Sequence, residues 1–212
     1  LRTWEAVVPG LHFVEPLDTT GAAITVHWVE HLAASRTGQA DLVWDRAGRI
    51  HHVVVSLALL GPNGRQLSDP SLSAIATHEI GHAWWGNTVT PTYPGGYMLS
   101  EALAGYSSLL ALEGVYGPER YKQALYISQP GTPPDFTIQN HFKFISENKD
   151  VALSRLTHEG PNDYQISLVK GTFFYHMLRR QVGDQVFFRT LKTLVAEHAG
   201  QTLSLDQLRA AF

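Results

Sequence analysis

The sequence contains no cysteine. This absence excludes disulfide bonds, a cysteine nucleophile and cysteine ligands for a metal ion. It leaves the cellular compartment open, because a chain of 212 residues buries a core that needs no disulfide in either redox environment. Any metal site in this chain must therefore be built from histidine and carboxylate side chains.

Long apolar runs and a strong charge bias are also missing. The longest apolar stretch, residues 53–60, is far shorter than the roughly 20 residues that a membrane-spanning helix needs. The net charge of −3 comes without a basic cluster. We therefore expect no nucleic-acid partner and no membrane insertion in this segment, while the oligomeric state stays open. Because the chain begins at Leu1 rather than at methionine, we expect either a fragment or the loss of a leading segment such as a signal peptide, which favours an extracytoplasmic location.

The N-terminal third of the chain has the pattern of strands and turns. Residues 23–30 and 40–44 are rich in β-branched and aromatic side chains. The turn at residues 45–48 separates the apolar residues 42–44 from the run at 50–60, which predicts a β-hairpin.

From Asp69 onward apolar residues recur at helical spacing. Asp69-Pro70 predicts the start of a helix that continues to Gly86. Further helices are expected at residues 100–116, 119–128, 164–182 and 186–198, and residues 129–162 are expected to be mostly loop with short helices. Ser204 and Gln207 form a capping-box pattern that opens a last helix. We therefore predict an α+β fold with a β-rich subdomain at residues 1–68 and a helical subdomain at residues 69–212.

A compact group of chemically active residues lies in the first of these helices. The run from His78 to His82 matches H-E-x-x-H. A spacing of four places both imidazoles on one helix face, one turn apart, where both can bind the same ion. Glu79 is adjacent to one ligand, so its carboxylate can reach an activated water as a general base. The pattern predicts a zinc site of the kind found in metallopeptidases.

A catalytic zinc ion needs three protein ligands and one open position. Glu101 follows His82 after eighteen intervening residues, near the start of the next predicted helix. A helix–loop–helix hairpin of this length can return Glu101 to the metal, which gives a His₂Glu site. Asp69 is a second candidate for the third ligand, although it lies about two turns before His78 on the same helix.

The run 78–107 resembles the gluzincin signature of the aminopeptidase N-like family of zinc metallopeptidases. The resemblance extends to W-x-G-N-x-V-T, which residues 84–90 match, and to N-E-G-F-A-x-Y, which residues 100–106 match in part. Lys170-Gly171 and the segment after it resemble a later helix of the family. The resemblance implies a thermolysin-like catalytic domain, with a small, mainly antiparallel sheet followed by a helical lobe. It also implies one Zn²⁺ per chain, held by His78, His82 and Glu101, and a peptide or protein substrate.

Two positions depart from the family pattern. The family has a tyrosine two residues before the Lys-Gly pair, which donates a hydrogen bond to the developing oxyanion, and here that position is Leu168. Tyr164 lies four residues earlier on the same predicted helix face and is our candidate replacement, ahead of His158 and Tyr175.

The second departure concerns the substrate's amino group. The family has a G-x-M-E-N segment before the zinc helix, whose glutamate binds the free amine. We find no such segment before Asp69, and Asp45 is the acidic residue at roughly the expected separation.

The sequence thus predicts a peptidase in which Glu79 is the general base and Tyr164 the candidate oxyanion donor. An aminopeptidase is one interpretation. The alternatives are a zinc endopeptidase, a catalytically idle zinc-containing binding module, and a fragment whose substrate pocket is completed by missing domains.

Overall fold

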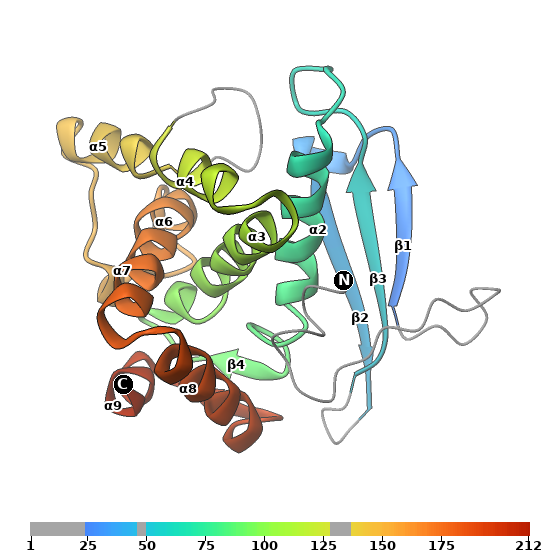
Figure 1. The fold of residues 1–212 in the computed structure, drawn as a ribbon. Coiled ribbons are helices and arrows are strands. Elements are labelled where there is room, and N and C mark those ends of the chain that lie inside the picture. The colour runs from blue at the N-terminus through green and yellow to red at the C-terminus, as the bar shows by residue number, and fades with distance from the viewer. Residues whose placement is uncertain (1–23, 46–49, 128–136) are drawn as a thin grey trace.

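The computed structural model describes residues 24–45, 50–127 and 137–212. A small sheet stands beside a larger helical lobe (Figure 1), which confirms the predicted α+β class. The segments that carry the sheet lie between residues 24 and 58, and the helices begin at Asp69. The division of the chain at residue 68 into two subdomains stays a prediction.

Three strands form the sheet, in the order β1-β3-β2. Their bounds are β1 (Ile24–Val29), β2 (Gly38–Trp44) and β3 (Ile50–Ala58). The pairing of β2 with β3 is antiparallel and confirms the predicted hairpin, while β1 pairs with β3 in parallel. The sheet is therefore mixed rather than mainly antiparallel. Strand β2 runs opposite to β1 after the 3₁₀ turn η1 (Ala33–Ser35), and β3 runs opposite to β2, so β3 points the same way as β1.

Helix α2 (Asp69–Gly81) lies between the sheet and the helical lobe (Figure 1). Its residues Ile75 and Ile80 join alternate residues of β3 in one apolar core. Ala74, on another side of α2, belongs to a second and larger core around α3 (Glu101–Tyr116). This double burial fixes α2 against both halves of the molecule, so side chains on α2 have well-defined positions.

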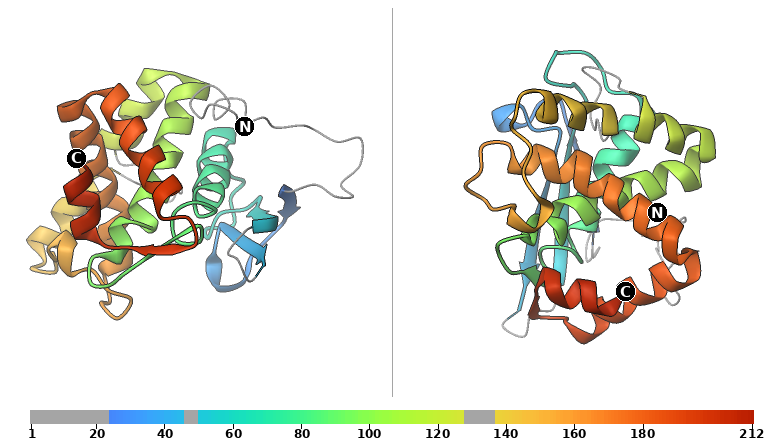
Figure 2. Two further views of the ribbon diagram at one scale, coloured as in Figure 1. Left: turned by 90° about the horizontal axis from the view of Figure 1, so that it is seen from below. Right: turned by 90° about the vertical axis from the view of Figure 1, so that its left-hand side faces the viewer.

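The remaining helices surround α3. They are α4 (Pro118–Tyr126), α5 (Ile138–Ser146), α6 (Asp163–Ile166), α7 (Thr172–Val182), α8 (Asp184–Glu197) and α9 (Leu205–Ala211), with η2 (Gly96–Met98), η3 (Leu153–Arg155) and the π-helical turn η4 (Ser167–Gly171). Helices α7, α8 and α9 lie on the side of the lobe away from the sheet (Figures 1 and 2). A second, two-stranded sheet joins β4 (Val89–Pro91) to β5 (Gln201–Leu203) in parallel. Within the described residues, no helix combines the length and apolarity needed to cross a membrane.

Most predicted helices are present, with three differences. The helix predicted to reach Gly86 ends at Gly81, because Asn87 and Thr88 turn back to bond the carbonyl oxygens of His82 and Ala83. The segment expected to be mostly loop contains the nine-residue helix α5. The run predicted at 164–182 is helical but contains the π-turn η4. The capping box at Ser204 is confirmed.

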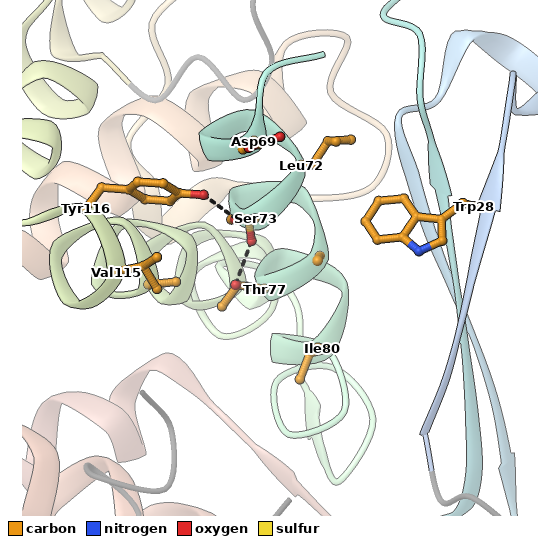
Figure 3. Close-up of a pocket in the computed structure, with 10 residues that line it drawn as sticks. Trp28, Asp69, Leu72, Ser73, Thr77, Ile80, Val115 and Tyr116 are labelled. Atoms are coloured by element: carbon orange, nitrogen blue, oxygen red, sulfur yellow. Dashed lines mark hydrogen bonds between the residues drawn. The ribbon is translucent and has the colours of Figure 1, made fainter. Parts of the chain in front are cut away.

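One cavity lies on the face of α2 near its N-terminus. It has a volume of about 410 Å³ and is lined from α2 by Leu72 and Asp69, among others. Figure 3 shows Trp28 of β1 standing across the gap from α2, while Tyr116 hydrogen-bonds Ser73 at 2.9 Å. Asp69 therefore belongs to this cavity and not to the histidine face of the helix.

Candidate active site

Close packing of α2 on α3 creates the scaffold of the site. A Cβ added to Gly81 would lie 3.2 Å from the Cα of Ala104 and 3.4 Å from the side chain of Ser107. Ser108, which is fully buried, donates from Oγ to the carbonyl oxygen of Ala74 at 2.6 Å. Small residues at this crossing let the two backbones approach, and this approach brings the start of α3 to the end of α2.

Three ligand atoms meet at that crossing. The Nε2 atoms of His78 and His82 are 3.1 Å apart, and Oε2 of Glu101 is 3.3 Å from the first and 3.6 Å from the second. A tetrahedral zinc site with metal–ligand bonds of about 2.0–2.1 Å separates its ligand atoms by about 3.3 Å. Two imidazoles and one carboxylate are also a donor set found in catalytic zinc sites. The group therefore fits a zinc ion in both spacing and chemistry.

The loop after α2 orients His82. Its Nδ1 lies 3.1 Å from the carbonyl oxygen of Trp85, to which it can donate a proton. A hydrogen on Nδ1 leaves the lone pair of Nε2 directed at the metal position. Trp85 is buried, and Asn87 donates to the carbonyl oxygen of His82 at 2.6 Å. The residues that follow the H-E-x-x-H pattern thus hold a ligand in place rather than extend the helix.

The charges of the group are coupled. Burial alone would raise the pKa of Glu101, but hydrogen bonds from His78 and His82 outweigh it and hold that pKa well below its usual range. Burial would lower the pKa of His82, but its hydrogen bond to Glu101 raises that pKa above the ordinary value. The carboxylate of Glu101 is therefore ionised, as a metal ligand must be.

Glu79 lies against strand β2. A Cβ added to Gly38 would lie 2.6 Å from Oε1 of Glu79 and 2.5 Å from Cγ2 of Ile75. Only a glycine at this position leaves room for the Glu79 carboxylate between strand and helix. Burial raises the pKa of Glu79, and the positive charges of His78 and His82 oppose this rise. The result is a carboxylate that is more basic than an exposed glutamate.

Strand β2 is the wall of the site that the sequence prediction missed. Within the described residues β2 pairs only with β3, so its other edge carries no strand partner. Residues 38–42, Gly-Gln-Ala-Asp-Leu, share the glycine and an acidic residue with the first and fourth positions of G-x-M-E-N. The glycine was the available signal, but methionine and asparagine are absent. Asp45 lies at the far end of the strand, about 20 Å from Gly38 along the chain, where it contacts His51.

Tyr164 precedes the π-turn and lies close to the charged group. Its ring centroid is 6.4 Å from that of Tyr97, on the segment leading to Glu101. Tyr164 keeps 45% of its surface exposed, yet its hydroxyl is more buried than the residue as a whole. Burial raises the pKa of this hydroxyl, and the negative charges of Glu101 and Glu79 add to the shift. The phenol therefore stays protonated and can donate a hydrogen bond.

The other proposed replacements for the family's tyrosine have other contacts. Tyr175 is fully buried, and its hydroxyl donates to the carbonyl oxygen of Met98 at 2.7 Å. His158 pairs through Nδ1 with the hydroxyl of Tyr97 at 3.2 Å. Leu168 packs against the large core. Asp69 begins α2, about 13 Å along the helix axis from His78, and is not part of the metal group.

Comparisons with known proteins agree with this geometry. A model of the peptidase family M1 domain matches residues 53–212. The chain is 26% identical over 141 residues to aminopeptidase M1 of Arabidopsis thaliana and 23% identical over 145 residues to aminopeptidase N of Lactococcus lactis subsp. lactis. Each match covers 66% of this chain, and the chain spans only 15% and 16% of the length of these relatives.

Solved structures show the same fold. The chain superposes on a mutant M1 zinc metallopeptidase from Deinococcus radiodurans with a TM-score of 0.56 and 16% identity, over 89% of this chain and 34% of that one. The same kind of enzyme bound to a Tyr-Ser-Ala substrate gives a TM-score of 0.52 and 19% identity, over 74% of this chain and 31% of that one. Because the family model covers about three quarters of the sequence, the chain belongs to peptidase family M1.

Proposed function

We propose that this chain is the catalytic part of a zinc-dependent aminopeptidase. The observation that carries the proposal is the His78–His82–Glu101 group, whose ligand atoms lie 3.1–3.6 Å apart in a member of a peptidase family. These three residues would hold one zinc ion. When bound, zinc supplies Lewis-acid polarisation of the scissile carbonyl and lowers the pKa of water toward neutrality.

Glu79 acts as the general base. Its carboxylate is adjacent to the metal group, and its raised pKa suits it to accept a proton near neutral pH. It takes a proton from the attacking water and delivers it to the leaving amine. Gly38 lets the carboxylate lie against β2, because a side chain at this position would displace it.

Tyr164 supplies the second donor to the developing oxyanion. Its protonated hydroxyl lies within the electrostatic influence of Glu79 and Glu101, and Leu168 at the family's position has no donor. A donor of this kind is preorganised for charge that appears only in the transition state.

The edge of β2 binds the substrate backbone, and Asp41 binds its free amine. An unpartnered strand edge offers backbone donors and acceptors to an extended peptide. Asp41 is exposed, and its carboxylate accepts two hydrogen bonds of 2.9 Å from Gln39 on the same strand. Asp41 lies about 10 Å along β2 from Gly38, the strand residue that contacts Glu79.

The test combines metal content with hydrolysis. Wild-type protein and Glu79→Gln are analysed for zinc and incubated with a mixed peptide pool. One zinc per chain in both proteins, with cleavage only in the wild type, is the expected result. One zinc with no cleavage in either protein would favour an idle module or a pocket completed by other domains. Leu168 supports the idle module, because it stands where the family has its oxyanion-binding tyrosine. Protein that contains no zinc after incubation with excess zinc would contradict the proposal.

The free-amine preference is tested separately with Asp41→Asn. We expect the ratio of kcat/KM for free-amine over N-acetylated peptides to fall about 10–100-fold, because a charge-assisted contact to the ammonium is lost. Arg209→Gln on α9, an exposed residue remote from the site, serves as the control. Equal cleavage of both peptides by the wild type would identify an endopeptidase.

A further inference from the structure

Arg36 is a cation at the mouth of the site. It follows η1 in extended conformation, with φ −68° and ψ 149°, and its backbone N–H donates to the carbonyl oxygen of Ala33 at 3.3 Å. The side chain is exposed, and its Nε donates to the same carbonyl oxygen at 3.3 Å. Among the described residues, no carboxylate forms an ion pair with it. Within the described part of the chain, the two terminal nitrogens of the guanidinium make no hydrogen bond.

The position of Arg36 relative to the chemistry follows from Gly38. Residues 36 and 38 are about 6.6 Å apart along an extended chain, and Gly38 lies directly against the carboxylate of Glu79. The backbone of Arg36 thus lies within one arginine side-chain length of Gly38, the residue that contacts Glu79.

The order of residues along β2 gives the site a direction. Under the proposed function, Asp41 receives the substrate amine and Glu79, beside Gly38, faces the scissile bond. A substrate strand held this way runs antiparallel to β2, because its amino end lies at Asp41 and its chain continues toward Gly38. Arg36 lies beyond Gly38, on the side of the leaving group.

We propose that Arg36 binds a carboxylate of the leaving portion, and that the preferred substrates are short peptides with a free C-terminal carboxylate. In a tripeptide that carboxylate is two residues, about 7 Å, beyond the scissile carbonyl, which matches the separation of residues 36 and 38. The guanidinium forms paired hydrogen bonds with a carboxylate, a geometry that lysine lacks. This inference rests on the proposed function for its direction along the strand.

The experiment compares Leu-Gly-Gly with its C-terminal amide. The zinc-loaded wild type, Arg36→Gln, Arg36→Lys and the control Arg209→Gln are assayed on both peptides. The wild type and the control should favour the free acid about 10–100-fold in kcat/KM. This ratio should fall to about one in Arg36→Gln and to an intermediate value in Arg36→Lys.

A third peptide, Leu-Asp-Gly amide, separates the two sources of a carboxylate. Slow hydrolysis, as for Leu-Gly-Gly amide, assigns the site to the chain terminus. Rapid hydrolysis that depends on Arg36 would overturn the terminal assignment in favour of an acidic side chain. A wild type that cleaves Leu-Gly-Gly and its amide equally would overturn the carboxylate site altogether, while leaving the peptidase proposal intact.

Binding without turnover distinguishes the two proposals. Calorimetry measures how tightly the same peptides bind to Glu79→Gln and to the double variant Arg36→Gln/Glu79→Gln. If the free-acid peptide binds Glu79→Gln more tightly than its amide, and this preference is lost in the double variant, the carboxylate site is supported. That support holds even if the wild type hydrolyses nothing, in which case only the proposed function fails. Equal binding of acid and amide to both variants contradicts the role of Arg36.

Discussion

The two walls of the site are built by the sequence in different ways. The helical wall, α2 with the start of α3, contributes the proposed zinc ligands and general base, and small residues let these helices lie close together. The strand wall, β2, contributes a glycine and a backbone edge that has no strand partner among the described residues, and a charged residue lies on each side of the glycine in the sequence. Side-chain chemistry leaves a spacing pattern in the sequence. A surface made by backbone leaves almost no such pattern. The two walls therefore differ in how well the sequence predicts them and in how substitutions in each should affect the protein.

The largest effect is expected from the helical wall with Glu101→Gln. Loss of the anionic ligand should lower zinc affinity by at least about 100-fold and abolish hydrolysis, because even residues that only orient ligands are worth about 10–100-fold. Zinc content after dialysis and thermal unfolding with and without a chelator measure the effect. The wild type should lose stability with the chelator, whereas the variant should not. Full zinc occupancy in the variant would remove Glu101 from the ligand set.

Tyr164→Phe tests a residue of α6 outside both walls and does not touch the proposed metal ligands. Removal of the hydroxyl should lower kcat by about 10²–10³ with little change in KM, because the contact forms only in the transition state. Leu168→Tyr in the same background is the matched partner, since it restores a phenol at the family's position. If Tyr164→Phe keeps wild-type kcat while zinc stays bound, the oxyanion donor is another residue.

The strand wall should fail differently in Gly38→Ala. The added methyl group would lie within 3 Å of Glu79 and Ile75, so the general base must move. A displacement of about 1 Å can lower the rate about 10²-fold. Zinc content should be unchanged, and this combination of full zinc and low kcat separates the strand wall from the helical wall. An unaffected rate would show that Glu79 adjusts to the strand.

The smallest effect is expected from Ser108→Ala at the α2–α3 crossing. The substitution removes the hydrogen bond to Ala74 but adds no bulk, so unfolding free energy should fall by about 1 kcal/mol. Chemical denaturation measures it, and zinc affinity should change little. A large loss of zinc affinity would mean that this bond sets the spacing of the ligands.

The helical wall and the α+β class could be predicted from the sequence. Helical periodicity placed His78 and His82 on one face, and the position of Glu101 after a short connection returned it to them. The end of α2 could not be predicted, because it depends on side chains of Asn87 and Thr88 that turn back onto the last carbonyl groups. The π-turn that ends at Gly171 also has no signal in apolar spacing. A Cβ there would lie 2.7 Å from that of Ala102, so the local packing needs a glycine.

The strand wall was missed for a different physical reason. Which strand edge faces Glu79 is decided by tertiary packing and register, and Asp45 and Asp41 are equally acidic in the sequence. Only the contact of Gly38 with Glu79 distinguishes them. The proposed binding of a carboxylate by Arg36 rests on the same contact of Gly38 with Glu79, so the sequence alone could not predict it.

The parallel pairing of β4 with β5 has a consequence for the order of assembly. The α2–α3 crossing joins segments close in sequence, so the three ligands can meet early in synthesis. The loop that carries the carbonyl partner of His82 is held by its own bonds from Asn87 and Thr88 and also by residues much later in the sequence, where Gly200 donates to Thr88 and Thr92 donates to Leu203. A nascent chain that has emerged only as far as α7 would therefore hold the ligands together while this loop lacks its contacts with β5. Metal capture should tighten only after β5 leaves the ribosome.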